Sequence, residues 1–402
     1  MKENNRVVIT GIGIIAANGN NKDEFYENCV NAKTGIRKCT LFDTSKLCTD
    51  YVGEIDADLP YEAGEDYEDD RIIQIMKNSI LQMFEDAKLT PDDVRELDNR
   101  AYLSLATSIA GNSRIKKFIK EQNAGTFDTR AILESSNFVS WIKNFCKIKG
   151  GCYTTMSACA AGSTAAGIGF DLIKDGEADL VIVGGADNVT DFTNMGFHAL
   201  KSLSSGICKP FDENRDGITI GEGGAFLVFE TLEHAKARNA HIYGEVLGYG
   251  INNDAYHITT PEPEGTGAIA AMNMAIKDAG IEAKEIGYIN AHGTGTRLND
   301  IMEIKAVEKV MDGKTDNLIL ASTKSLTGHC LGAAGAVELV ATVLGMENGV
   351  CLPTGTLENV MEGYDEKLLP NKAVKHEYKY ALSNSFAFAG NTASIVIGKV
   401  EE

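Results

Sequence analysis

The feature that most constrains this chain is an alternation of short, uniformly apolar β-type runs with longer segments of helical periodicity. Residues 286–290 and 318–321 are two such runs, and the segments that follow them, 300–311 and 332–346, have apolar residues at helical spacing. Strands without an in–out alternation are typical of sheets that are covered on both faces. The chain is therefore expected to form α/β layers with largely parallel sheets.

The same alternation extends over most of the sequence. It predicts further strands at 101–109, 152–155, 179–185, 243–247, 378–382 and 393–397, and further helices at 22–32, 71–89, 160–173 and 267–279. The order of elements is similar on the two sides of residue 245, which suggests a duplicated unit with halves 1–245 and 246–402. Residues from about 110 to 150 interrupt the rhythm, and we expect an inserted cap there.

Charge and cysteine content exclude several classes of protein. A formal net charge of −19 opposes binding to nucleic acid and to anionic membranes. No apolar run reaches about 18 residues and no segment has the features of a secretory signal, so neither membrane spanning nor secretion is expected. The nine cysteines are scattered and lack the paired spacing of metal sites, which fits reduced thiols. A cytoplasmic protein is the resulting expectation.

One cysteine stands in an unusual setting. Cys159 lies in a run of small residues between the expected strand 152–155 and the expected helix 160–173. At the N-terminus of a helix, backbone amides and the helix dipole stabilise a thiolate and lower the pKa of a thiol. This arrangement favours a nucleophile, although from the stretch alone a buried structural cysteine is an equal alternative.

Two histidines follow strands of the second half. His292 stands in Asn-Ala-His-Gly-Thr-Gly-Thr after the strand 286–290, and His329 ends the motif Lys-Ser-Leu-Thr-Gly-His after 318–321. Sites in α/β folds form where parallel strands end, so both histidines are expected at a site. A metal site is the competing interpretation. The sequence has no His-x-x-His pair or nearby carboxylate cluster to support it, so no metal is expected.

Taken together, the motifs around Cys159, His292 and His329 resemble those of the condensing enzymes of the thiolase superfamily. The β-ketoacyl-acyl carrier protein synthases of KAS II type, and the related polyketide ketosynthases, are the most similar. The similarity extends over nearly the whole chain and includes residues 209–217 and 254–261. This resemblance implies a thiolase-like fold, with two duplicated α/β halves in a layered αβαβα core.

The resemblance also implies an activity. Cys159 would take an acyl chain from a carrier-protein thioester. A malonyl unit on acyl carrier protein would then lose CO2 and attack the acyl-cysteine, giving 3-oxoacyl-acyl carrier protein. His292 and His329, as neutral imidazoles, would hold the enolate oxygen that develops. The substrates would travel on the phosphopantetheine arm of the carrier, so no separate cofactor is expected.

Further roles follow from the same resemblance. Lys324 would support the histidines, with Glu303 as its carboxylate partner, although a purely structural ion pair is an alternative for these two residues. The backbone amides of Cys159 and Phe388 would form the oxyanion hole, and Phe388 would gate the acyl pocket. The residues that resemble those hydrogen-bonding the pantetheine arm are Thr294 and Thr296.

The resemblance implies a dimer, for which the apolar strand 179–185 is the expected interface. The partner would be a second copy or a paralogous chain of the chain-length-factor kind. The pathway stays open between fatty acid elongation and the type II polyketide or aryl polyene pathways. Two other classes are disfavoured: chain-length factors lack the nucleophile that Cys159 supplies, and degradative thiolases use coenzyme A and a different second cysteine.

Two departures from the family pattern carry consequences. In the loop usually written Gly-Phe-Gly-Gly-Thr-Asn, Ala387 and Ala389 replace glycines. Alanine at positive φ would stiffen the gate, whereas at ordinary φ the change would be neutral. The stretch 62–70, basic in the family, is acidic here and would repel an acidic carrier. The alternative basic candidates for docking are Arg114, Lys116, Lys117, Lys201 and Lys209.

Overall fold

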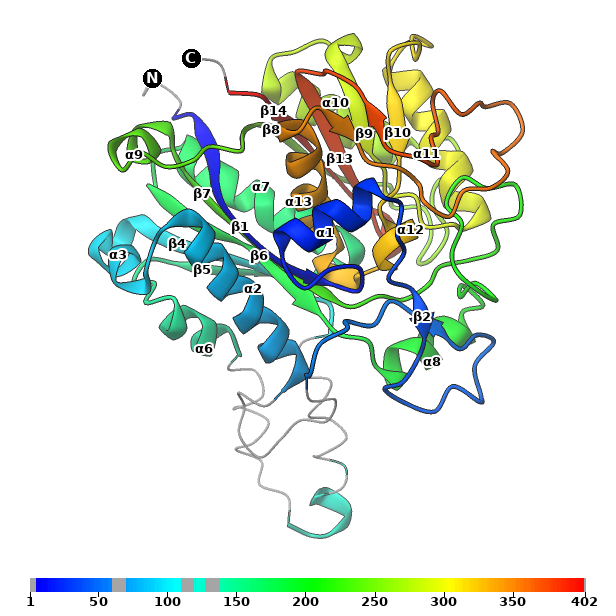
Figure 1. The fold of residues 1–402 in the computed structure, drawn as a ribbon, viewed down its shortest axis with the longest axis horizontal. Helices are drawn as coiled ribbons and strands as arrows, with labels where there is room; N and C mark the ends of the chain where they lie inside the picture. The colour runs from blue at the N-terminus through cyan, green and yellow to red at the C-terminus, as the bar shows by residue number, and fades with distance from the viewer. Residues whose placement is uncertain (1–4, 60–69, 110–118, 120, 127–137, 401–402) are drawn as a thin grey trace.

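A ten-stranded mixed sheet runs through the molecule in the order β10-β9-β13-β14-β8-β1-β7-β6-β4-β5 (Figure 1). The computed structural model describes residues 5–59, 70–109, 119, 121–126 and 138–400. The strands of the sheet are β1 (Val7–Ala16), β4 (Ala101–Ala106), β5 (Cys152–Thr155), β6 (Leu180–Asp187), β7 (Gly223–Thr231), β8 (Gly244–Asn253), β9 (Ile286–Asn290), β10 (Ile319–Ala321), β13 (Tyr380–Phe386) and β14 (Asn391–Gly398).

The strand order contains the same pattern twice. Read outward from the centre, β1-β7-β6-β4-β5 of the first half corresponds, strand for strand in chain order, to β8-β14-β13-β9-β10 of the second half. The halves meet where residues 7–9 of β1 pair antiparallel with residues 244–246 of β8. The duplicated architecture is therefore confirmed, while the domain limits 1–245 and 246–402 stay a prediction.

Strand direction differs from the expectation of largely parallel sheets. Parallel pairing is confined to the two ends, β6-β4-β5 and β13-β9-β10, and the central pairings from β13-β14 to β6-β7 are antiparallel. Strand β7 returns directly beside β6, and its counterpart β14 returns directly beside β13. Neither return has a crossover, so each pair is antiparallel. Strand β7 was not predicted from the sequence. The expected strands and helices are all present, with ends that are shifted.

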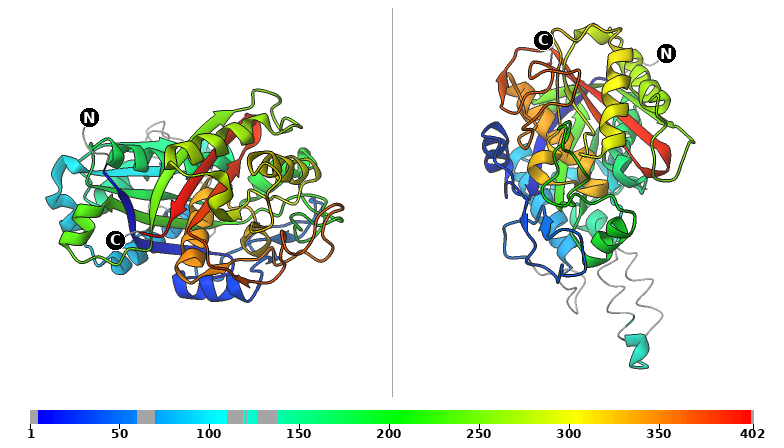
Figure 2. Two further views of the ribbon diagram at one scale, coloured as in Figure 1. Left: turned by 90° about the horizontal axis from the view of Figure 1, so that it is seen from above. Right: turned by 90° about the vertical axis from the view of Figure 1, so that its right-hand side faces the viewer.

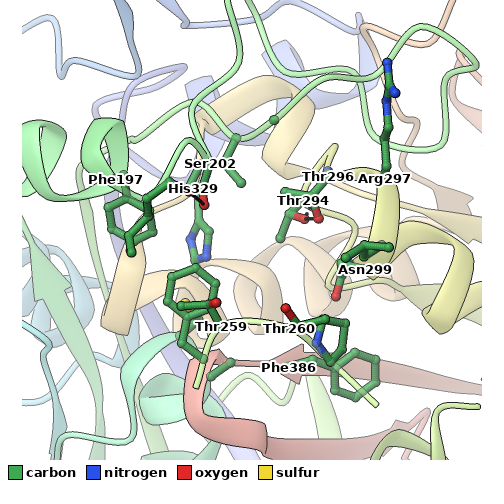
Figure 3. Close-up of a pocket in the computed structure, with 18 of the residues that line it drawn as sticks. Phe197, Ser202, Thr259, Thr260, Thr294, Thr296, Arg297, Asn299, His329 and Phe386 are labelled. Carbon is green, nitrogen blue, oxygen red and sulfur yellow. Dashed lines mark hydrogen bonds between the residues drawn. The ribbon is translucent and has the colours of Figure 1, made fainter. Parts of the chain in front are cut away.

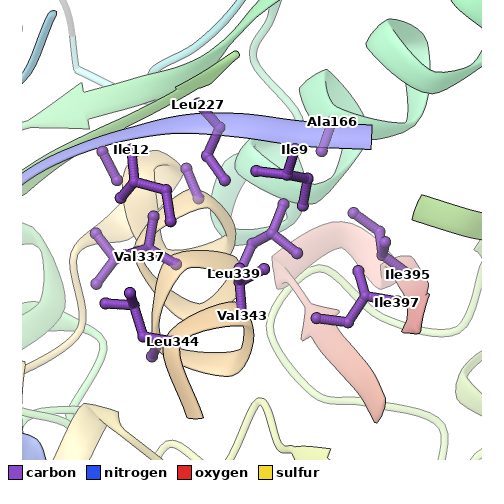
Figure 4. Close-up of a cluster of buried hydrophobic side chains, with 14 of the residues drawn as sticks. Ile9, Ile12, Ala166, Leu227, Val337, Leu339, Val343, Leu344, Ile395 and Ile397 are labelled. Carbon is purple, nitrogen blue, oxygen red and sulfur yellow. The ribbon is translucent and has the colours of Figure 1, made fainter. Parts of the chain in front are cut away.

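Helices divide the structure into five layers, α/β/α/β/α. One hydrophobic core lies between α2 and the first half of the sheet, a second surrounds α7 and α13, and a third lies between the second half and α10 with α11. In the central core, Leu339 and Val343 of α13 face Ile9, Leu227 and Ile395 from three strands (Figure 4). Figure 2 gives two further views of this stacking. These helices are α2 (Arg71–Ala87), α7 (Ala161–Lys174), α10 (Thr266–Ala279), α11 (Arg297–Val310) and α13 (Ala334–Glu347).

Smaller helices among the described residues are α1 (Lys22–Val30), α3 (Pro91–Glu96), α6 (Phe138–Phe145), α8 (Asp191–Ala199), α9 (Leu232–Ala237) and α12 (Lys324–Thr327). None of the described helices is long and apolar enough to cross a membrane. Most of the expected cap at 110–150 lies outside the described residues, and within it α6 packs Phe138 and Ile142 into the core beside α2.

The acidic stretch 62–70 also lies outside the described residues, apart from its last member. Asp70 is buried, and its side chain caps the N-terminus of α2. Arg71 is buried as well and forms a bidentate ion pair with Glu222. Neither Asp70 nor Arg71 is therefore a surface group that could repel or attract a carrier.

The expectation that 179–185 forms a dimer interface is wrong. This run is β6, which lies between β4 and β7, and every residue of the strand is buried within the single chain. The strand at the edge of the sheet on this side is β5, whose Tyr153 is 43% exposed. Apolar composition marked β6 as buried, but only the strand order decides what buries it.

Candidate active site

Cys159 stands on a tight turn between β5 and α7, so the expected strand, turn and helix are confirmed. The turn is the 3₁₀ segment Ala158–Ala160, and Ala158 has φ +50°. A left-handed backbone costs a residue other than glycine about 1–2 kcal/mol. Such strain persists only where the surrounding structure imposes it. The turn places Cys159, 8% exposed, in the wall of a cavity.

The thiol differs from the expectation of a lowered pKa. Burial raises the pKa of Cys159 to about 11, although the charge of Lys324 and the backbone N–H groups of Cys159 and Phe388 act in the opposite direction. Desolvation disfavours the thiolate more strongly than the end of the helix favours it. The two amides that act on the sulfur are the pair that the family resemblance names for the oxyanion hole.

His292 follows β9, and its loop is tied to the first turns of α11. The carboxylate of Glu303 accepts hydrogen bonds from the N–H groups of His292, at 2.8 Å, and Gly293, at 2.7 Å. Asp300 accepts from the next two amides of the loop. Burial raises the pKa of Glu303 to about 7 despite its bonds to the amides. Helix α11 thus fixes the backbone from which the His292 ring projects.

Lys324 opens α12 and reaches the first histidine. Its Nζ lies 3.3 Å from Nδ1 of His292 and forms a buried salt bridge with the carboxylate of Glu338 on α13. The expected pairing of Lys324 with Glu303 is therefore wrong, because Glu303 accepts from the His292 loop instead. The sequence held a signal that was missed. Glu338 is the one acidic residue in the apolar helical segment 332–346, where a buried charge requires a partner.

Both histidines are held as neutral hydrogen-bond donors. Burial lowers the pKa of His292 and of His329 well below the usual value, and the charge of Lys324 adds to the effect. Nδ1 of His292 faces the Lys324 ammonium group, and Nδ1 of His329 accepts from the N–H of Leu331 at 3.1 Å. A neutral imidazole that accepts at Nδ1 carries its hydrogen at Nε2. Each ring therefore offers one Nε2–H donor.

The nucleophile and the two histidines come together. The rings of His292 and His329 are 5.5 Å apart between centroids and almost perpendicular, at 83°. The Cys159 sulfur and a nitrogen of each ring lie within 4.8 Å of one another. Among the described residues, this is a group whose spacing would also suit a metal ion. Thiolate and imidazole are donors that zinc accepts. A ring nitrogen that carries a hydrogen cannot bind a metal, so the hydrogens at Nε2 oppose zinc binding. The two histidines instead act as hydrogen-bond donors next to a nucleophile.

A cavity of about 350 Å³ leads to these groups (Figure 3). The hydroxyls of Thr294 and Thr296 lie 3.0 Å apart on its wall. Also in the wall, the ring of Phe388 packs against that of Phe197, with 5.7 Å between centroids. Other residues of the wall had no role assigned from the sequence, among them Ser202, His257, Thr259, Thr260, Arg297 and Leu298.

The loop between β13 and β14 contains the two alanines that replace family glycines. Ala387 has φ −125°, which any residue adopts, whereas Ala389 has φ +60°. The first replacement is thus neutral for the backbone, and the second costs about 1–2 kcal/mol. The N–H of Ala389 donates to the carbonyl of Ile258 at 2.8 Å, which ties this loop to the one after β8.

Comparisons with known proteins agree with this geometry. Residues 4–235 match the family described as "Beta-ketoacyl synthase, N-terminal domain", and residues 243–358 match "Beta-ketoacyl synthase, C-terminal domain". A curated relative, 3-oxoacyl-[acyl-carrier-protein] synthase 2 of Staphylococcus aureus strain N315, is 34% identical over 416 residues, with 100% of both chains covered.

Solved structures give the same result. The ishigamide ketosynthase/chain length factor superposes with a TM-score of 0.89 at 32% identity, over 99% of this chain and 100% of that one. A type II polyketide ketosynthase, solved in complex with its acyl-carrier protein and bound to a hexaketide, superposes with a TM-score of 0.88 at 29% identity over the same shares of the two chains.

Proposed function

The chain belongs to the β-ketoacyl synthase family, and on that premise we propose that it condenses an acyl chain held on Cys159 with malonyl-acyl carrier protein. The products are 3-oxoacyl-acyl carrier protein and CO2, as in fatty acid chain elongation. One observation carries the proposal: the Cys159 thiol and a ring nitrogen of each of two neutral imidazoles lie within 4.8 Å of one another in the wall of one cavity.

The first step transfers the acyl group. The Cys159 sulfur attacks the thioester carbonyl of the acyl carrier, and its proton leaves with the carrier thiol. The carbonyl oxygen becomes an oxyanion in the transition state, and the amides of Cys159 and Phe388, which act on the sulfur, would stabilise it. The same amides favour the thiolate. They therefore offset part of the rise in pKa by which burial keeps the free thiol protonated.

The second step forms the new carbon–carbon bond. Malonyl carrier loses CO2 and leaves an enolate, whose oxygen accepts from Nε2–H of His292 and His329. The enolate carbon attacks the acyl-cysteine, the Cys159 thiolate is expelled, and a proton from solvent restores the thiol. Lys324, held by Glu338, donates to Nδ1 of His292 and keeps its Nε2 protonated.

The wall of the cavity suits the arm that brings the substrates. A phosphopantetheine arm carries amide and hydroxyl groups, and the paired hydroxyls of Thr294 and Thr296 can donate to them or accept from them. Phe388 packs on Phe197 in the cavity wall, and an acyl chain that passes between the two rings would displace it. We assign the two threonines to arm binding and Phe388 to gating.

The mouth of the cavity suits an acidic carrier. Lys201 and Arg297 line it, and neither forms a salt bridge within the described part of the chain. Exposed apolar side chains stand next to both, with Leu200 at 51% and Leu298 at 59% exposure. Lys209, a basic candidate from the sequence, is neutralised by Glu358 at 2.6 Å. The docking surface proposed here is the mouth around Lys201 and Arg297.

The edge strand β5 suits a dimer. Among the described residues, no strand neighbours its outer backbone groups, and Tyr153 and Met156 beside it are 43% and 65% exposed. A second copy is the partner in the fatty acid reading. In the alternative, the protein is a type II polyketide or aryl polyene ketosynthase and its partner is a chain-length-factor-like paralogue. The likeness to the ishigamide ketosynthase/chain length factor favours this alternative.

The nine cysteines are all unpaired, which supports a cytoplasmic location.

The test is direct. The protein is incubated with a series of acyl carriers and with malonyl carrier, and the acyl-enzyme, CO2 and 3-oxoacyl product are measured. Cys159→Ala should abolish acyl loading, whereas Cys208→Ala, which removes a buried thiol away from the cavity wall, should retain it. Absence of product from the wild type with every carrier would refute the proposal. The acyl chains that load, identified by intact-protein mass spectrometry, separate the two pathways.

A further inference from the structure

A buried carboxylate that the mechanism above does not use connects three segments behind the second active-site histidine. Asp187, the last residue of β6, is fully buried. It accepts hydrogen bonds from the Thr107 hydroxyl at 2.6 Å, from the amides of Ser108 at 2.9 Å and Ile109 at 3.2 Å, and from the amide of Gly332 at 2.6 Å. The donors come from both halves of the chain.

The segment around Gly332 is tightly constrained. A Cβ on Gly332 would lie 2.7 Å from the backbone nitrogen of Ser108, so only glycine lets these backbones approach closely enough for one carboxylate to bridge them. The residue before it, Leu331, is buried and has φ +51°, a conformation that leucine adopts only when its surroundings impose it. Its N–H is the donor to Nδ1 of His329.

We propose that Asp187 is a positioning residue for His329. By holding the Gly332 amide, it keeps Leu331 in the left-handed conformation that aims the Leu331 N–H at Nδ1, which in turn fixes the hydrogen at Nε2 of His329. The inference rests on the proposed function, in which that Nε2–H stabilises the enolate formed on decarboxylation.

The chemistry of the group supports a role beyond packing. Burial raises the pKa of Asp187 to about 6, and the groups that oppose this rise are the hydroxyl and amides named above. A buried carboxylate that neutral donors hold, as they do among the described residues, is costly for the fold, and an apolar residue of similar size would fill the space more cheaply. A carboxylate is, however, an acceptor at every lone pair, which several converging amides require.

The experiment replaces Asp187 by asparagine, whose NH2 group would face one of the amides that the carboxylate now accepts from. Acyl loading of Cys159 and decarboxylation of malonyl carrier are measured separately. We expect kcat for decarboxylation to fall about 10–100-fold with KM and acyl loading changed less than about threefold, because only a donor to the enolate is displaced. Thr107→Val, which removes one donor to Asp187 but leaves the Gly332 bond, is the control and should behave like the wild type.

A spectroscopic measurement accompanies the kinetics. In 15N-histidine-labelled protein, the His329 signals of the wild type should show a single tautomer with hydrogen at Nε2, and those of the Asp187→Asn protein should show a mixture. Equal losses in both half-reactions, or an unchanged tautomer, would overturn the proposal. If Asp187→Asn fails to fold, Asp187→Ser, which removes the carboxylate without adding bulk, tests the same bond. A wild type that is inactive with every carrier would refute the proposed function, and the tautomer would still decide this inference.

Discussion

The two alanines in the loop around Phe388 allow a matched test of backbone strain. Ala387→Gly and Ala389→Gly make the same chemical change two residues apart, so each raises the entropy of the unfolded chain by a similar 0.4–1 kcal/mol, roughly. Only Ala389 has positive φ, at +60°, whereas Ala387 has φ −125°. Glycine at position 389 therefore relieves about 1–2 kcal/mol that glycine at position 387 does not.

The difference between the two variants isolates that cost, because the unfolded-state term cancels. In urea unfolding with equal m-values, Ala389→Gly should be about 1–2 kcal/mol more stable than Ala387→Gly. Relief of strain should also free the loop, so Ala389→Gly should change the rate of acyl loading across a chain-length series while Ala387→Gly leaves it unchanged. Equal stabilities in the two variants would refute the strain argument. Unchanged loading in the Ala389 variant would refute the link to the gate.

Glu338→Gln leaves the Lys324 ammonium buried without a carboxylate and should cost about 3–5 kcal/mol in urea unfolding; a loss below about 1 kcal/mol would contradict the ion pair. Because burial raises the pKa of Glu303 from 4.5 to about 7, its contribution to stability is full below pH 4.5 and is lost as the pH rises through 7. Glu303→Gln should therefore remove up to about 3 kcal/mol of the fall in unfolding free energy over that range, and an unchanged slope would exclude this group. Tyr153→Lys on β5 should yield monomers in sedimentation, whereas an intact dimer would place the interface elsewhere. Arg297→Glu should raise KM for malonyl carrier roughly tenfold at low salt without affecting malonyl-pantetheine, and equal effects on both substrates would argue against carrier docking.

Local patterns, together with the family resemblance that they carry, predicted the residues of the proposed chemistry. Cys159, His292 and His329 each stand in a short motif that follows a strand, which is where α/β folds place their sites. The structure brings these three residues to one cavity. Their neighbours in space were harder to predict. Glu338 is 14 residues from Lys324 and approaches it only because α13 crosses behind the site.

The sequence by itself determined most of the elements, the duplicated order and the motif residues, because periodicity and turn chemistry act over a few neighbouring positions. It did not determine which strands are central, and so β6 was mistaken for an interface and β7 was missed. It also did not determine how deeply each group is buried, which is why the pKa of Cys159 lies above its usual value instead of below it. Strand order, ion-pair partners and desolvation depend on contacts between segments far apart in the chain, and only the tertiary structure decides them.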